Sequence, residues 1–336
     1  MTSTTPTLAT IELGDGLRVP VQGFGAMSLT DVYGPVSDDD ALATLTHAVD
    51  AGATFVDTAN IYGEGRSERI ISRLLRTRRD EVQLATKVGI TPNGGIGRRA
   101  PRGDPAHIRE QIDLSLGRLG TDAVELYYLH RVDPNVPIED SVGALAELVA
   151  AGKVRHIGLS EATGDELRRA QAVHPIAAVQ SEWSIVSRDV EAHVVPAARE
   201  LGIGFVPYSP LSRQWLTGAF DESALTDADG RRSFPRFAPE ALAANAPVLA
   251  EVRAVAVDAG LTPAQLALAW LYAKGDELGL PVVPIPGTRF ADRVDENLSA
   301  VGVALDPAHI ARLDALAPRV AGHRSFQATW VSAGRE

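Results

Sequence analysis

The chain has 336 residues, of which 45% are hydrophobic and 22% are charged, an ordinary composition for a globular protein with a large core. Its formal net charge of −11 argues against nucleic acid or an anionic membrane as a partner, and the absence of cysteine excludes disulfides, thiol nucleophiles and thiolate metal sites. No apolar stretch is long enough to span a bilayer, and residues 1–7 lack the features of a secretory leader. We therefore expect a cytoplasmic protein.

The first predicted element is a β-hairpin, in which residues 9–13 and 17–21 flank the glycine-rich turn at residues 14–16. Beyond it, short apolar strands alternate with helical patterns. Eight strands are predicted, at residues 21–26, 54–57, 82–87, 124–130, 154–160, 177–180, 204–207 and 282–285.

The helices between these strands carry recognisable start and stop signals. Asp104 and Thr262 each precede a proline, the pattern of an N-cap followed by proline in the first turn, and Asp306 does the same after the last strand. Gly152 and Gly202 are placed to end helices. Strand–helix alternation of this kind predicts a parallel sheet.

A parallel sheet of eight strands forms either a closed barrel or a doubly wound open sheet. The open sheet usually carries a glycine-rich phosphate loop after its first strand, and none is found there. The only formal match, Gly95 to Ala100, lies in a basic loop that does not open a helix. We therefore predict an α/β fold, a (β/α)8 TIM barrel with an N-terminal β-hairpin, as one domain over residues 1–336.

Three stretches lack strand or helix periodicity: residues 89–103, 211–239 and 318–336. Long irregular segments in a compact domain are usually functional loops or disordered. We expect long loops at the C-terminal face of the barrel, and flexible or loop-like tails at residues 1–8 and 318–336.

Four polar residues accompany the ends of three consecutive strands: Asp57, Tyr62, Lys87 and His130. In a parallel barrel the carboxyl ends of the strands meet at one mouth, where catalytic sites lie. An ammonium beside a tyrosine stabilises the phenolate, an aspartate holds the ammonium in place, and a histidine can hydrogen-bond a carbonyl oxygen. Together these residues predict acid-assisted reduction of a carbonyl by a hydride donor.

Each of these residues, taken alone, also fits a purely structural role. A strand-end aspartate is often a cap, a tyrosine or histidine is often a satisfied core residue, and a lysine is often solvated. Lys87 also fits a Schiff-base aldolase or lyase. The eight histidines are scattered without metal-binding spacing, so we predict no metal site.

Nine segments follow one another in a characteristic order and spacing: Gly23-Phe-Gly-Ala-Met27, Asp57-Thr-Ala-Asn-Ile-Tyr62, Ala85-Thr-Lys87, Tyr127-Tyr-Leu-His130, Gly152 to Ser160, Gln180-Ser-Glu-Trp183, Pro207 to Leu211, Pro284 to Arg289 and Arg293-Val-Asp-Glu-Asn297. Through these segments the chain resembles the aldo-keto reductases over nearly all its length, from about residue 17 to residue 317. Its motifs are most similar to those of the branch that includes perakine-reductase-like and pyridoxal-reductase-like enzymes.

The resemblance implies a barrel that uses NADPH to reduce aldehydes or ketones, with Tyr62 as general acid, Lys87 and Asp57 as its supporting pair and His130 orienting the carbonyl. It places Ser160 and Gln180 on the nicotinamide carboxamide and Tyr208 against the ring, with Glu161 where many relatives have asparagine. The remaining implied cofactor contacts are Gly25, Met27, Asp57, Ser209, Leu211, Arg213, Gly287, Thr288, Arg289, Arg293, Glu296 and Asn297.

A substrate pocket is expected from aromatic residues in the irregular segments, and we name Tyr33, Trp183, Trp215 and Trp330. The expected partner is a small carbonyl compound, and a homo-oligomer is compatible with the fold. A cofactor-binding regulatory subunit, as in the potassium-channel β branch of the family, is an alternative function.

Overall fold

Seven parallel strands form a single curled sheet in the computed structural model, which describes residues 8–91, 99–226 and 229–336. Their order, β11-β10-β9-β8-β5-β4-β3, follows the chain, as a barrel requires. The strands are β3 Phe24–Gly25, β4 Phe55–Asp57, β5 Gln83–Val88, β8 Val124–Leu129, β9 Val154–Ser160, β10 Ala178–Gln180 and β11 Gly204–Phe205.

Residues 282–285 occupy the eighth position and close the barrel. Val283 donates its N–H to the carbonyl of Phe205 at 2.9 Å, and Gly23 donates to the carbonyl of Pro284 at 3.0 Å. The segment therefore bonds to the last strand and the first strand, although only a single bridge, Phe205 to Val282, is formed. Prolines 281, 284 and 286 lack the N–H that a regular ladder needs. The predicted eight-membered barrel is confirmed, with an irregular last member.

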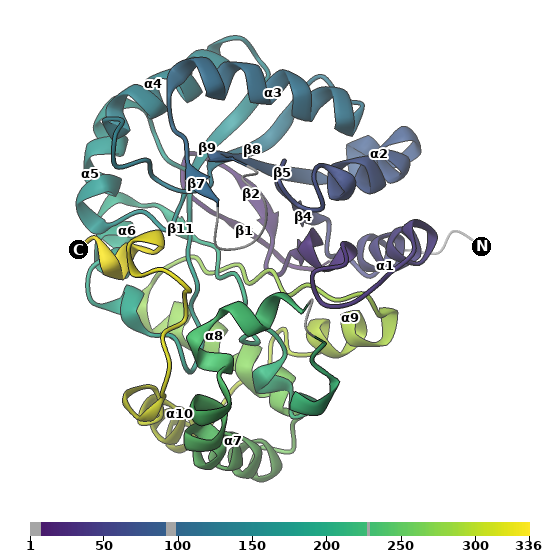
Figure 1. Ribbon diagram of the computed structural model, residues 1–336, viewed down its shortest axis with the longest axis vertical. Helices are drawn as coiled ribbons and strands as arrows, with labels where there is room; N and C mark the ends of the chain where they lie inside the picture. The colour runs from purple at the N-terminus through teal and green to yellow at the C-terminus, as the bar shows by residue number, and fades with distance from the viewer. Residues whose placement is uncertain (1–7, 92–98, 227–228) are drawn as a thin grey trace.

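Helices surround the sheet, as Figure 1 shows. They are α1 Asp38–Asp50, α2 Arg66–Arg78, α3 Pro105–Leu119, α4 Ile138–Ala150, α5 Gly164–Val173, α6 Val194–Leu201, α7 Pro239–Asp258, α8 Pro263–Leu278, α9 Ala291–Leu298 and α10 Pro307–Asp314. The predicted caps are in place: Asp104, Thr262 and Asp306 accept from N–H groups of the first turn, and Gly202 ends α6 in the left-handed conformation.

The predicted hairpin, formed by β1 Thr10–Glu12 and β2 Arg18–Pro20, closes the N-terminal end of the barrel. Leu13 and Leu17 pack with the residues that fill the barrel interior, among them Phe55. Gly204 makes this approach possible, because a Cβ there would lie 2.3 Å from the side chain of Leu13. The hairpin thus covers this end of the barrel.

The irregular segments gather at the opposite mouth of the barrel. Strands β6 Ile90–Thr91 and β7 Ala100–Pro101 pair antiparallel, and the Gly95–Gly97 motif between them lies outside the described residues, as does most of the predicted tail 1–8. Short 3-10 turns also occur along the chain: η1 Ala26–Leu29, η2 Arg79–Glu81, η3 Asp189–Glu191, η4 Trp215–Thr217, η5 Glu222–Ala224, η6 Gly230–Ser233, η7 Pro235–Phe237, η8 Ala317–Arg319, η9 Ala328–Trp330 and η10 Ser332–Gly334.

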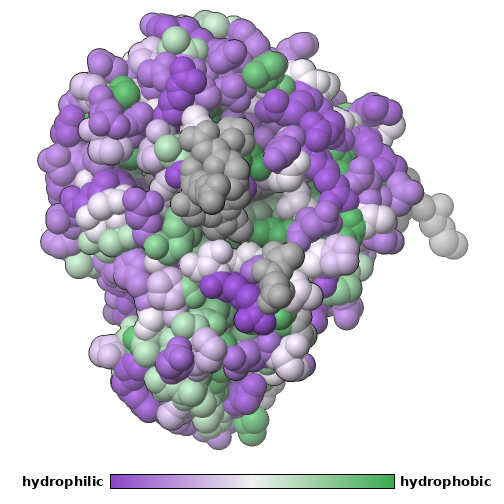
Figure 2. All heavy atoms as spheres, in the orientation of Figure 1, coloured by the Kyte–Doolittle hydropathy of each residue, from purple (hydrophilic) through white to green (hydrophobic). Residues whose placement is uncertain are grey.

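The C-terminal segment, residues 318–336, is loop-like and bound to the barrel. Arg335 donates to the carbonyl of Glu161 at 2.6 Å and pairs with Glu166 at 2.9 Å, and Arg324 reaches Glu161. Figure 2 shows mostly hydrophilic side chains over the upper part of this face, with hydrophobic side chains near its centre and mixed into its lower part.

Helix length and hydropathy bear on whether the chain could cross a lipid bilayer. In the described part of the chain no single helix is both long and apolar enough to do so. Helices α7 and α8 have the necessary length and composition only when taken together, and they meet at a bend of 85°.

Candidate active site

The mouth of the barrel brings the four predicted catalytic residues together. Asp57 is the last residue of β4, Lys87 lies in β5, His130 follows β8, and Tyr62 lies in the turn after β4. The ammonium of Lys87 donates to Asp57 and, at 2.7 Å, to the carbonyl of Thr58. It also lies 3.5 Å from the Tyr62 hydroxyl. The side chains therefore converge as the strand ends predict.

Asp57 and Lys87 form an ion pair with almost no solvent contact, since Lys87 is 0% exposed and Asp57 2%. Gln180 donates a further hydrogen bond to Asp57 at 2.8 Å. Burial raises the pKa of the Asp57 carboxyl above its usual value, while Lys87 and Gln180 act against that rise. A buried charge pair persists only with such additional hydrogen bonds, which fix the position of the ammonium.

His130 lies beside Tyr62, with ring centroids 5.8 Å apart and the planes at 82°. Burial lowers the pKa of His130 well below its usual value, and the positive charges of Arg131 and Lys87 add to this. The imidazole is therefore neutral near pH 7, and a neutral imidazole has one N–H to donate. Its Nδ1 atom has no hydrogen-bond partner among the described residues.

The residues expected around a nicotinamide ring lie at the same mouth. Ser160 ends β9, Gln180 ends β10, and Tyr208 follows β11. The Tyr208 hydroxyl donates to Glu161 at 2.7 Å, which fixes the orientation of the aromatic ring. Arg131, next to His130, donates to the Ser160 hydroxyl at 3.1 Å.

Glu161 is a fully buried carboxylate that holds the C-terminal segment in place. Arg324 reaches it with two hydrogen bonds, of 2.8 and 2.9 Å, and the N–H of Ser332 donates to it at 3.1 Å. Burial favours a raised pKa for Glu161, but the guanidinium of Arg324 overcomes it and holds the pKa well below its usual range. The carboxylate is therefore ionised and serves as an anchor.

A second buried carboxylate, Glu182, forms an ion pair with Arg213, one of the residues expected to contact the cofactor. Arg213 pairs with it at 2.9 Å and stacks on Phe234, with 4.2 Å between guanidinium carbon and ring centroid. Arg236 lies 3.6 Å from the same carboxylate. In this conformation Arg213 already has a charge partner, so any phosphate it contacts shares the guanidinium with Glu182.

A groove of about 620 Å³ lies between the start of α1 and the start of α9. The guanidinium groups of Arg289 and Arg293 both lie against the ring of Phe290, 5.2 and 5.1 Å from its centroid. Arg289 and Phe290 line the groove together with Pro35, Val36, Asp40, Ala43, Thr44, Ala291 and Asp292. Two cations beside an open groove at a helix start suit a phosphate group.

The acidic neighbours of Arg293 do not neutralise its side chain. Asp295 is bonded to His47 at 2.7 Å, and Asp292 accepts from the backbone N–H of Arg293 at 3.0 Å. Within the described ranges, no carboxylate lies in ion-pair contact with Arg289 or Arg293. Their charges are thus free to meet an anion.

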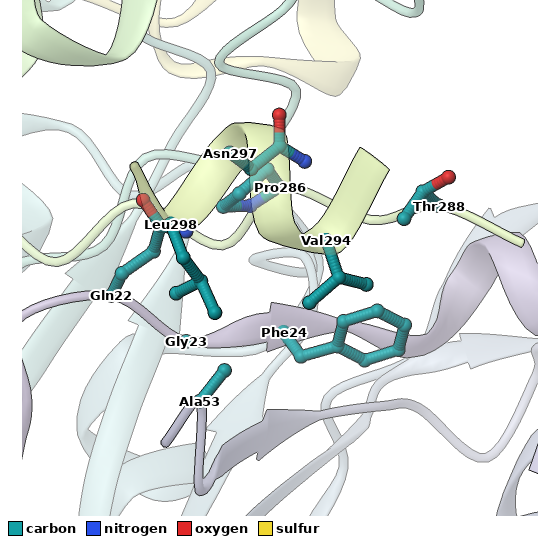
Figure 3. A pocket seen from close by; sticks show the side chains of 9 residues that line it. All are labelled: Gln22, Gly23, Phe24, Ala53, Pro286, Thr288, Val294, Asn297 and Leu298. Carbon is teal, nitrogen blue, oxygen red and sulfur yellow. The ribbon is translucent and has the colours of Figure 1, made fainter. Parts of the chain in front are cut away.

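Four other residues expected to contact the cofactor lie in or near the segment from Gly287 to Asn297 and differ in their surroundings. Gly287 packs so closely on β3 that a Cβ would lie 2.3 Å from the carbonyl oxygen of Gly25, and Ser28 donates to the carbonyl of Thr288 at 3.0 Å. Asn297 is buried and lines a cavity of only about 10 Å³, the room for one water (Figure 3). Glu296 is half-buried on α9. Asn297 therefore faces this small cavity and not the groove.

The four aromatic residues named for the substrate pocket divide into two pairs. Trp330 packs with Ile61, Ile90 and Tyr62. Tyr33 is half-buried, and burial raises the pKa of its hydroxyl. Arg213 acts against this rise and Tyr62 adds to it, so Tyr33 lies near both residues. Trp183 and Trp215, by contrast, are 0% and 1% exposed and belong to the core between strands and helices. Both side chains are therefore core residues in this structure, and a contact of either with a substrate stays a prediction.

Three further residues expected to contact the cofactor lie in turns that follow barrel strands. Met27 is half-buried in η1, Ser209 has a positive φ of 48°, and Leu211 is half-buried beside it. Ser209 begins a stretch in which Ser212, Arg213 and Gln214 also have positive φ values. Such a strained loop is often found at a ligand site.

Comparison with known proteins places the chain among oxidoreductases. The profile of the Aldo/keto reductase family matches residues 23–318. A Glycine max protein named probable aldo-keto reductase 1 is 40% identical over 321 residues, covering 94% of this chain and 91% of that protein. A thermostable aldo-keto reductase solved with the inhibitor epalrestat is 27% identical, with a TM-score of 0.72 over 92% of this chain and all of that one. The glycerol dehydrogenase of Gluconobacter oxydans is 25% identical, with a TM-score of 0.80 over 93% and 95% of the two chains.

Three charged residues of the mouth are not predicted from the sequence: Arg131, Glu182 and Arg324. Arg131 and Glu182 are adjacent in sequence to predicted site residues, and that adjacency could have pointed to them. Arg324 lies in a segment without periodicity, and nothing in the sequence links it to Glu161, 163 residues away.

Proposed function

The chain belongs to the aldo/keto reductase family, and from that premise we propose that it reduces an aldehyde or ketone with NADPH, using Tyr62 as the general acid. Members of the family carry out carbonyl reduction with a nicotinamide cofactor. The observation that carries the proposal is the position of the Lys87 ammonium, between Asp57 and the Tyr62 hydroxyl. The bound reduced nicotinamide supplies the hydride.

The surrounding residues have separate tasks in this reaction. His130, neutral at physiological pH, donates its N–H to the carbonyl oxygen and orients it. Tyr62 gives its proton to the same oxygen as negative charge develops there, and Lys87 stabilises the phenolate that remains. Asp57 and the carbonyl of Thr58 hold the ammonium in place. This supports a role for Lys87 as an electrostatic partner and not as a Schiff-base nucleophile, which must be neutral to attack.

Preference for NADPH over NADH is proposed from the groove beside α9. Arg289 lines this groove, and Arg293 lies against the ring of Phe290, which also lines it. Neither arginine has a carboxylate partner in the described part of the chain. A phosphate dianion on the adenosine ribose is matched by two guanidinium groups, whereas a ribose hydroxyl gains little from them.

The substrate class is narrowed by the apolar wall of Trp330, Ile61 and Ile90 beside Tyr62. An aromatic or alkyl aldehyde fits such a wall. The test is a panel of aldehydes and ketones, pyridoxal and aromatic aldehydes included, followed by the absorbance of reduced cofactor with NADPH and with NADH. Turnover that is faster with NADPH supports the proposal; cofactor binding without turnover on any carbonyl would contradict it.

A further inference from the structure

The carboxylate of Glu161 has no free acceptor position for a hydrogen bond from a ligand. One oxygen accepts from the Tyr208 hydroxyl at 2.7 Å, from Arg324 at 2.8 Å and from the N–H of Glu182 at 3.1 Å. The other accepts from Arg324 at 2.9 Å and from the N–H of Ser332 at 3.1 Å. A carboxylate offers about four lone-pair sites, and these five donors occupy them. The position next to Ser160, where a side-chain amide would serve the nicotinamide, is therefore closed to the cofactor.

Arg131 lies beside the same serine and has a hydrogen-bond donor without a partner among the described residues. Its Nη1 donates to the carbonyl of His130 at 2.5 Å and to the Ser160 hydroxyl at 3.1 Å, but its Nε has no partner among the described residues. The residue is 8% exposed and makes no ion pair within the described ranges. A buried polar group without a partner is costly, and a ligand that accepts its hydrogen bond removes this cost.

The guanidinium of Arg131 also lies near two aromatic rings. Its carbon is 6.0 Å from the ring centroid of Tyr208 and 5.6 Å from that of Trp330. Tyr208 is the residue against which the nicotinamide ring is expected to stack, so the guanidinium lies next to the place expected for that ring.

We propose that Arg131 binds the carboxamide of the nicotinamide. Glu161 is not available for this contact, because its carboxylate is bonded to the C-terminal segment. The amide oxygen accepts from the guanidinium, and Ser160 and Gln180 bind the rest of the carboxamide. This inference rests on the proposed function, because it assumes a nicotinamide cofactor at this mouth.

The test separates the nicotinamide from the rest of the cofactor. Calorimetry measures the binding of NADP+ and of adenosine 2′,5′-bisphosphate, which has no nicotinamide, to the wild-type chain and to Arg131→Met. We expect the variant to bind NADP+ about 10- to 100-fold more weakly, the effect of losing a hydrogen bond to a charged group, and the bisphosphate unchanged. The thionicotinamide analogue of NADP+, whose sulfur is a poorer hydrogen-bond acceptor than the amide oxygen, completes a thermodynamic cycle with the variant. The wild type should bind the analogue more weakly than NADP+, whereas Arg131→Met should bind the two equally.

Two control variants accompany the measurement. Arg319→Met removes an exposed arginine from η8 and should leave all affinities unchanged. Arg131→Lys keeps the buried charge but lacks the planar fork, so it should show most of the NADP+ loss, and it replaces Arg131→Met if that variant does not fold.

The outcomes distinguish the inference from the function on which it rests. Unchanged NADP+ affinity in Arg131→Met, or equal loss for NADP+ and the bisphosphate, overturns the inference. A change in Arg131→Met that is confined to the KM for the carbonyl substrate also overturns the inference, because it would mean that Arg131 contacts the substrate and not the cofactor. If the wild-type chain binds neither nucleotide, the proposed function itself fails.

Discussion

The ammonium of Lys87 lies 3.5 Å from the hydroxyl of Tyr62, although the two residues come from different strand–helix units. The contact exists because Asp57 and the carbonyl of Thr58 hold the ammonium on its other side. Burial of the pair means that the lysine cannot move away into solvent. The position of the ammonium beside the Tyr62 hydroxyl is therefore fixed by Asp57 and the Thr58 carbonyl.

Replacing Lys87 with methionine is expected to remove activity and to destabilise the fold. Asp57 is then left buried without its counter-charge, which costs about 3–5 kcal/mol of unfolding free energy. The double variant Lys87→Met/Asp57→Asn should regain part of that stability in urea unfolding without regaining activity. Full activity in either variant would contradict the role given to the ammonium.

Carbonyl reduction should show no titration of His130 near neutral pH. The pKa of His130 is lowered well below its usual value, so the imidazole stays neutral as the pH falls through about 6.5, the ordinary value for histidine. A pH profile of kcat/KM for the wild type and His130→Gln measures this. The variant should be slower at every pH without a change in the shape of the profile around that value; a step present only in the wild type would contradict the assignment.

The ion pair between Arg324 and Glu161 is expected to hold the C-terminal segment, and with it Trp330, against the mouth. Arg324→Met leaves a buried carboxylate short of its main partner, so the segment should become sensitive to proteolysis and the KM for the carbonyl should rise. Arg319→Met, from an exposed position in the same segment, is the control and should leave both unchanged. Protection from protease equal to that of the wild type would argue against the anchor.

The same pair predicts how stability depends on pH. Because the pKa of Glu161 is depressed in the folded chain, its contribution is complete above about 4.3, the ordinary value for a glutamate, and is lost as the pH falls below it. Urea unfolding of the wild type and Glu161→Gln at several pH values measures this. The difference in unfolding free energy between them should shrink on acidification; a constant difference would contradict the depressed pKa.

Arg293→Ala should weaken NADPH binding more than NADH binding. The guanidinium lies against the ring of Phe290, which lines the groove at α9. Losing it should remove about 1.5–3 kcal/mol of binding free energy from a contact that only the phosphorylated cofactor makes. Fluorescence titration with both cofactors measures the difference. The control is Arg155→Ala, an exposed arginine in β9 that should affect neither. Equal losses for both cofactors would remove Arg293 from the phosphate site.

The alternation of strands and helices, with its caps and stops, is enough to predict the barrel and the convergence of Asp57, Lys87 and His130, since strand ends in a parallel barrel must meet. Residues 282–285 are placed correctly, although their prolines prevent a regular strand. The burial of Trp183 is not predictable, because an aromatic after a strand can turn toward the mouth or toward the helices, and sequence alone does not decide between them. The link between Glu161 and Arg324 is not predictable, because it depends on the path of a segment without periodicity.

The most direct measurement of the central claim is the rate of NADPH oxidation by a reducible aldehyde in Tyr62→Phe, with NADPH affinity determined on the same sample. Loss of the proton donor should slow the reaction about 100- to 10,000-fold, while the affinity for NADPH stays at the wild-type value. Tyr272→Phe, which removes a hydroxyl bonded to Gln22 outside the mouth, is the control and should retain activity. Wild-type rates in Tyr62→Phe would contradict Tyr62 as the general acid.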